Sequence, residues 1–394
     1  MQYSSTLTAH HIRNRYFTTN ELQAICNSLK SNISLVTLNI SFNKFGDYSA
    51  KLISDLIKSN FTLTSLDISG NDIGNNGARF LGEALVVNTV LSYLNISYNF
   101  ISEEGVKHLS NALKSNVTLT TLDLNSNRMG AEGVKSISEA LKYNSTIKQL
   151  NIRANKIGGK GAKSISELLQ TNYLTDIHLA CNNIGGDDGA ASISKALISN
   201  STLTVLHLSD NNFGDDDTTA IFEALKSNNT LTYLDFFTNN IGINGAKTIC
   251  QFLKLNSTLT SLNLEDNSLG DDGSKTIFDG LNNNTLTNLY LSENDIGVHG
   301  AKSISQFLKL NSTLKTLYLG NSHDINSVID SLKSNTTITE LHIEDCNIDS
   351  DGVKLISEVL KINSTLSILY LNNNNLGDDG MKSIGESLCL NNSL

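Results

Sequence analysis

The sequence predicts an α/β solenoid in which short parallel strands line a concave inner face and helices cover the convex outer face. Two observations predict it. A segment of about 28 residues recurs along the 394-residue chain. Each copy alternates apolar and polar residues, as a strand does, and then spaces its apolar residues along one face of a helix. Strands pair about 4.8 Å apart whereas packed helices need about 8–10 Å, so the stack should curve into a horseshoe.

The strand part of each copy reads L-x-x-L-x-[LI]-x-x-N-x-[IL]-G, and its leucines should turn inward. A degenerate earlier copy begins at Leu7, with His10 and Arg15 where Leu and Asn recur. We therefore expect about 13 repeats in residues 35–394 and a capping repeat in residues 1–34. The 13 copies begin at Leu35, Leu63, Leu91, Leu119, Ile147, Leu174, Leu203, Leu231, Leu259, Leu286, Leu314, Ile338 and Leu366.

The helix part reads G-[AV]-K-x-I-x-x-x-L, as in the copy that carries Val134, Ile137 and Leu141 on one apolar face. Carboxylates such as Asp271 and Asp272 precede it, but another copy has Gly159 and Lys160 at these positions. A metal site would not tolerate that exchange. We therefore interpret these acids as caps of helix N-termini.

The ninth position of the strand part is asparagine in almost every copy, with Ser322 and Cys346 as exceptions. This position follows the strand and points inward, where an amide can satisfy backbone groups of the turn. The recurrence therefore predicts a ladder of buried asparagines with a structural role.

The whole repeat resembles the leucine-rich repeats of the ribonuclease-inhibitor type, which occur in ribonuclease inhibitor, the Ran GTPase-activating protein and NOD-like receptors. The resemblance implies a horseshoe that binds other proteins without catalysing a reaction. It leaves two alternatives open. One is a regulator of a small GTPase, with Arg128 or Arg153 near the nucleotide. The other is a secreted bacterial effector that acts on a host protein in the host cytosol.

Composition argues against several other classes of function. The net charge of -10 makes nucleic acid or an anionic membrane an unexpected partner. No apolar run approaches the length of a membrane span, and the first residues lack the apolar core of a signal peptide. The five cysteines are scattered without CxxC spacing, which indicates free thiols in a reducing compartment. Glycosylation sequons in most repeats also favour a cytoplasmic location.

Positions that point away from the buried leucines turn aromatic and acidic in the later repeats. Large aromatic anchors among acids suit a protein partner with a basic surface. We therefore expect such a partner, and no small-molecule substrate, on the concave face. The predicted binding residues are Tyr233, Phe237, Glu265, Asp266, Tyr290, Glu293, Asp295, Tyr318, Glu340, His342, Glu344 and Tyr370.

An enzyme or metalloprotein would need side chains that converge. His178, His207 and Asp235 occupy the same position on three successive predicted strands and could hold zinc. Side chains on adjacent strands project in parallel, however, and this argues against convergence. We expect no catalytic residue, no metal site and no cofactor.

The repeat pattern is interrupted at two places. The repeat that begins at Leu314 is four residues short, because GNSHDINSVIDSLKSN lacks the GAK turn. The sequence ends at Leu394, the first position of a further copy, which leaves the last helix without a polar cap. We expect an array that is truncated or uncapped at this end, and a monomer or a dimer formed through that edge.

Overall fold

A computed structural model describes residues 8–15, 17–186, 188–281 and 285–391. The chain divides into two compact units, Met1–His207 and Leu208–Leu394, which are described separately below. No helix among these described residues has the length and apolar character needed to cross a membrane.

In the described part of the first unit, eight strands alternate with seven helices. The strands pair in parallel in chain order, and the register advances by one repeat per strand, so that Leu38 pairs with Leu66 and Leu66 with Leu94. The strands are β1 (Ala9–His11), β2 (Thr37–Asn39), β3 (Ser65–Asp67), β4 (Tyr93–Asn95), β5 (Thr121–Asp123), β6 (Gln149–Asn151), β7 (Asp176–His178) and β8 (Val205–His207). The helices are α1 (Thr19–Lys30), α2 (Gly46–Ser59), α3 (Asn75–Val87), α4 (Glu103–Leu113), α5 (Gly130–Leu141), α6 (Gly158–Leu169) and α7 (Gly189–Ser199).

The second unit continues the alternation with six parallel strands and seven helices in its described residues. The strands are β9 (Tyr233–Asp235), β10 (Ser261–Asn263), β11 (Asn288–Tyr290), β12 (Thr316–Tyr318), β13 (Glu340–His342) and β14 (Ile368–Tyr370). The helices are α8 (Asp215–Leu225), α9 (Ile243–Leu255), α10 (Gly270–Gly280), α11 (Val298–Leu308), α12 (Asn326–Ser331), α13 (Ser350–Ile362) and α14 (Gly377–Leu388).

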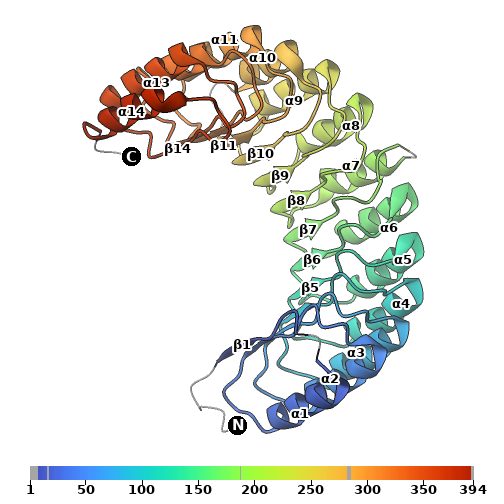
Figure 1. Cartoon of the computed structure of the whole chain (residues 1–394). Helices are drawn as coiled ribbons and strands as arrows, with labels where there is room; N and C mark the ends of the chain where they lie inside the picture. The colour runs from blue at the N-terminus through green and yellow to red at the C-terminus, as the bar shows by residue number, and fades with distance from the viewer. Residues whose placement is uncertain (1–7, 16, 187, 282–284, 392–394) are drawn as a thin grey trace. The chain divides into compact units, whose positions relative to one another are not determined.

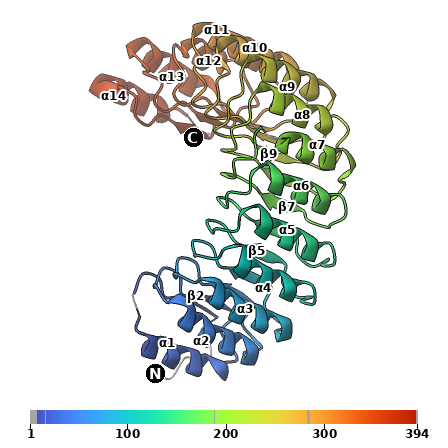
Figure 2. The same ribbon diagram turned by 90° about the vertical axis from the view of Figure 1, so that its right-hand side faces the viewer.

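Within each unit the strands form an inner layer and the helices an outer layer (Figures 1 and 2). The inward leucines of the strands and the apolar helix faces fill the space between the layers. Leu66, Leu234 and Leu262, for example, are completely buried. Burial of each such side chain stabilises the folded state by about 2 kcal/mol. The predicted α/β class and the order of its layers are therefore confirmed.

The predicted asparagine ladder is present in both units. Asn71 is fully buried, and its Oδ1 accepts a hydrogen bond from the backbone N–H of Asn43, one repeat earlier, at 2.8 Å. Its Nδ2 donates to the carbonyls of Ile40 and Ile68, both at 3.0 Å. Each ladder asparagine thus joins its own turn to that of the preceding repeat.

A second asparagine ladder coincides with the glycosylation sequons. Nδ2 of Asn60 donates at 2.8 Å to the carbonyl of Leu29, near the end of α1 in the preceding repeat. Its Oδ1 accepts from the backbone N–H groups of Thr62 and Leu63 at 3.0 and 2.8 Å. Asn60 is only 3% exposed. The recurring N-x-[ST] motif is therefore explained by packing, a role that the sequence reasoning missed.

The short repeat that begins at Leu314 shortens the helix layer of the second unit. Thr316 pairs with Glu340, a step of 24 residues, whereas the preceding step from Asn288 to Thr316 is 28 residues. Helix α12 has only six residues. The missing GAK turn thus removes the first part of the helix and leaves the strand pairing intact.

Candidate functional site

Four aromatic rings stack along the inner face of the second unit. Tyr290, Tyr318, His342 and Tyr370 occupy the last position of β11, β12, β13 and β14, and strand register pairs each with the next. Successive ring centroids lie 4.5, 3.5 and 4.1 Å apart. We call this row the aromatic ladder. Tyr318, His342 and Tyr370 stack with 12° and 18° between successive rings, whereas Tyr290 is tilted by 41° against Tyr318.

His342 is held between two carboxylates as well as between two rings. Its Nε2 lies 2.9 Å from Oε1 of Glu340 and its Nδ1 lies 3.1 Å from Oε1 of Glu344. Both ring nitrogens therefore face carboxylate oxygens. The side chain is buried, and Tyr318 stacks on it nearly parallel.

Carboxylates beside the ladder create a negative potential. Burial raises the pKa of Glu265, and the nearby Asp235 and Glu344 raise it further, although a hydrogen bond from Ser292 opposes them. Burial and the neighbouring Glu340 raise the pKa of Tyr318 to about 12. Its hydroxyl therefore stays protonated at neutral pH and can donate a hydrogen bond to a partner.

The structure separates the predicted binding residues into two groups. Nine lie on the inner face of the sheet, at or beside the strands and opposite the buried leucines: Tyr233, Phe237, Glu265, Tyr290, Tyr318, Glu340, His342, Glu344 and Tyr370. Asp266, Glu293 and Asp295 instead lie in the turns after β10 and β11, with φ of 50°, 57° and 54°. Asp266 accepts a hydrogen bond from Thr238 at 2.8 Å, and Glu293 accepts one from Asn321. These three acids form an exposed rim beside the ladder.

Sequence reasoning grouped His178 and His207 with Asp235. The structure instead groups them with Asp176, which lies two residues before His178 on β7. The two imidazoles stack at 3.7 Å with 16° between their planes. Strand alternation could have identified Asp176, because residues two apart share a face of the sheet.

Arg128, considered above for a GTPase regulator, is already engaged. Its guanidinium lies 4.5 Å from the ring centroid of Phe100. The other candidate arginine, Arg153, is exposed in the repeat that contains β6. Nothing in this arrangement marks a nucleotide site.

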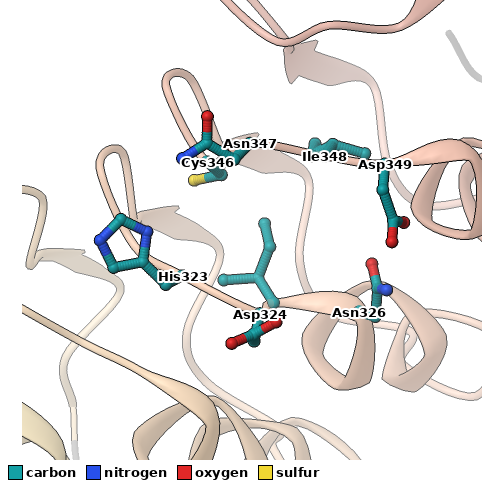
Figure 3. Close-up of a pocket in the computed structure, with 8 residues that line it drawn as sticks. His323, Asp324, Asn326, Cys346, Asn347, Ile348 and Asp349 are labelled. Atoms are coloured by element: carbon teal, nitrogen blue, oxygen red, sulfur yellow. The ribbon is translucent and has the colours of Figure 1, made fainter.

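A polar cavity of about 250 Å³ lies at the short repeat of the second unit. Figure 3 shows Asn326 and Asp349 facing each other at one end, with Cys346 and His323 at the other. Burial raises the pKa of the Cys346 thiol to about 11. This thiol is therefore protonated at neutral pH and unsuited to act as a nucleophile.

Comparison with protein families identifies the repeat. A model described as "Leucine Rich repeat" matches twelve segments of the chain. The interval from 306 to 333, which contains the short helix α12, is not matched. The matched segments are residues 31–54, 59–82, 87–110, 115–138, 143–166, 171–194, 199–222, 227–250, 255–278, 282–305, 334–357 and 363–385.

The other comparisons add little. A search of curated proteins gave no match. Among solved structures, the chain is similar to one titled "Leiomodin-1 Actin-Binding Site 2 (ABS2)", with 24% identity over 36% of this chain and 87% of that chain. The TM-score is 0.33, too low to carry an argument about function. The family assignment rests on the repeats, which cover most of the sequence: the chain belongs to the leucine-rich repeat family.

Proposed function

We propose that this leucine-rich repeat protein is a non-catalytic scaffold that binds a basic protein partner on the inner face of its second unit. The observation that carries the proposal is the aromatic ladder with Glu265, Glu340 and Glu344 beside it. Three tyrosines and one histidine form a row that is stiffened by stacking, and carboxylates lie on both sides. Ordered aromatic side chains lose little entropy on binding, which suits them to anchor a partner.

Charge defines the class of partner. On the inner face of the second unit, no lysine or arginine occurs at the first and third positions of β9–β14 or at the second position after each strand. Asp235, Glu265, Glu340 and Glu344 occupy four of these positions. Their negative potential steers lysine and arginine side chains to the ladder and accelerates association at low salt.

We also propose a cytoplasmic location. None of the five cysteines, all of which lie in the described residues, forms a disulfide. Free thiols persist in a reducing compartment. The sequon asparagines use their amide groups within the fold, as Asn60 does, which accounts for the motif without a glycan.

The test is capture of partners from a cytosolic lysate, followed by mass spectrometry. The full chain would be compared with Tyr290→Ala/Glu265→Lys and with the control Tyr143→Ala/Glu139→Lys. The control makes the same exchanges at two exposed positions of the first unit. Circular dichroism would first establish that all three chains fold.

We expect one or more basic proteins to be lost from the first variant and retained by the control, with retention that weakens as salt rises. A photoreactive phenylalanine analogue at position 290 should then cross-link to the same protein. Equal capture by all three chains would reject the inner face of the second unit as the binding surface.

A further inference from the structure

A group of potential metal ligands lies in the first unit, apart from the residues of the proposed partner site. Among the described residues, Asp176, His178 and His207 are the one group of three potential metal ligands with ligand atoms within 4.8 Å of one another. Strand register produces this group. Asp176 and His178 are on one face of β7, and His207 pairs with His178 from β8.

We propose that Asp176, His178 and His207 bind a divalent transition-metal ion of the zinc class. Two imidazoles and one carboxylate are the donors that zinc, cobalt(II), nickel(II) and copper(II) accept, whereas magnesium and calcium prefer oxygen ligands alone. All three side chains are partly accessible, so a water molecule can complete a tetrahedral set.

The distances between the three ligand groups fit a tetrahedral ion after a small rotation of the imidazole rings. Two ligands bonded to a tetrahedral zinc ion lie about 3.4 Å apart. Oδ1 of Asp176 lies 3.2 Å from Nε2 of His178, and the centroids of the two imidazoles lie 3.7 Å apart. Stacked rings direct their nitrogens in parallel. The χ2 torsion of histidine has a broad minimum, however, and a modest rotation of each ring would turn both nitrogens toward one point.

The environment of Asp176 supports the proposal independently. Its Oδ1 is buried, and in the described part of the chain it accepts no hydrogen bond. Nε2 of His178 lies 3.2 Å away but is not aligned for a hydrogen bond. A buried carboxylate oxygen without a donor is costly, and a bound cation would satisfy it.

The stacked imidazoles of His178 and His207 each place a nitrogen within 4.8 Å of the other and of the Asp176 carboxylate. His342 in the second unit provides a contrast, because carboxylates on opposite sides occupy both of its nitrogens and cannot converge with them on one ion.

The test is calorimetric titration of the metal-free full chain with Zn²⁺. We expect one ion per chain with micromolar or tighter affinity. Asp176→Asn should weaken binding at least tenfold, and His207→Gln should abolish it. Two controls make the same exchanges at exposed positions, His299→Gln and Asp72→Asn, and should leave the affinity unchanged.

Titration with Co²⁺ distinguishes this site from the cysteines. A set of nitrogen and oxygen ligands gives visible bands without the intense near-ultraviolet band of a cobalt–thiolate bond. Absence of saturable binding by the wild type, retention of binding by folded Asp176→Asn and His207→Gln, or a thiolate band removed by alkylating the cysteines would each overturn the proposal. Circular dichroism would verify the fold of each variant, and the wild-type titration decides the matter if a variant fails to fold.

Discussion

Oδ1 of Asp271 accepts a hydrogen bond at 2.7 Å from the backbone N–H of Gly300, which lies 29 residues later in the first turn of the next helix. The same oxygen accepts from Gly297 at 2.8 Å. Asp271 was predicted to cap a helix, but it caps that of the following repeat, α11, and not its own. Asp47 and Asp215 make the equivalent pairs of bonds to Gly74 with Gly77 and to Gly242 with Gly245.

This contact also explains the glycine of the recurring GAK motif. A Cβ at position 300 would lie 2.8 Å from Oδ1 of Asp271 and 2.6 Å from Oγ of Ser274. Only glycine allows the carboxylate to approach the helix so closely. The acid of one repeat therefore requires the glycine of the next, because a side chain there would displace the carboxylate.

The first prediction separates two adjacent acids. Asp271→Ala removes an acceptor shared by two N–H groups and should lower the free energy of unfolding by about 1–2 kcal/mol. Asp272→Ala removes the same charge from an exposed neighbour and should change it by less than about 0.5 kcal/mol. Urea denaturation would measure both values, and hydrogen exchange should show the loss concentrated in α11. Equal effects of the two substitutions would mean that charge alone matters at this turn.

The second prediction concerns the first asparagine ladder. Asn239 is buried, accepts from the backbone N–H of Phe213 at 3.0 Å and donates to the carbonyl of Phe236 at 3.0 Å. Asn239→Ala leaves these buried groups without partners and should cost about 3 kcal/mol. Asn240 is next in sequence but exposed, so Asn240→Ala should be nearly neutral. Thermal denaturation followed by circular dichroism compares the pair, and similar melting temperatures would contradict the assigned role.

The third prediction follows from the raised pKa of Glu265. A carboxyl whose pKa is higher in the folded state binds protons more tightly there, so its contribution to stability falls as pH rises through that pKa. At pH 7 the ionised, partly buried carboxylate is destabilising. Glu265→Gln should therefore raise the melting temperature at pH 7, and the difference should vanish below the pKa of an unfolded glutamate.

Glu386→Gln is the control for that experiment, because Glu386 is exposed on α14. It should give the same melting temperature as the wild type at both pH values. A Glu265→Gln variant that is less stable than the wild type at pH 7 would show that the carboxylate is held by favourable contacts.

The fourth prediction concerns thiol reactivity. Burial raises the pKa of Cys26 to about 12 and that of Cys346 to about 11, whereas Cys389 is exposed on the residue after α14. Maleimide at neutral pH should therefore modify Cys389 in the folded protein much faster than Cys26 or Cys346. Mass spectrometry of the labelled peptides measures the order. Cys389→Ser should remove the fast phase, and rapid labelling of Cys346 would contradict its burial.

The repeat sequence by itself determined the class of fold, the inward direction of the leucines and the structural role of the ninth-position asparagine. It could do so because strand alternation and helix spacing are local, and because the same local pattern recurs in copy after copy. By the same rule, nine residues of the predicted binding surface were placed on the face of the sheet opposite the buried leucines. Asp266, Glu293 and Asp295 were not, because the left-handed turns after the strands interrupt the alternation.

Only the tertiary structure decided which side chains meet across repeats. The bond from Gly300 to Asp271, the carbonyl of Leu29 beside Asn60 and the grouping of Asp176 with His178 and His207 each join two strands or two helices of neighbouring copies. Such contacts depend on how closely one repeat stacks on the next and on the rotamer each side chain adopts in that space. A periodic sequence specifies the face on which a residue lies. The stacking of the layers sets the distances on which caps, ladders and ligand sets depend.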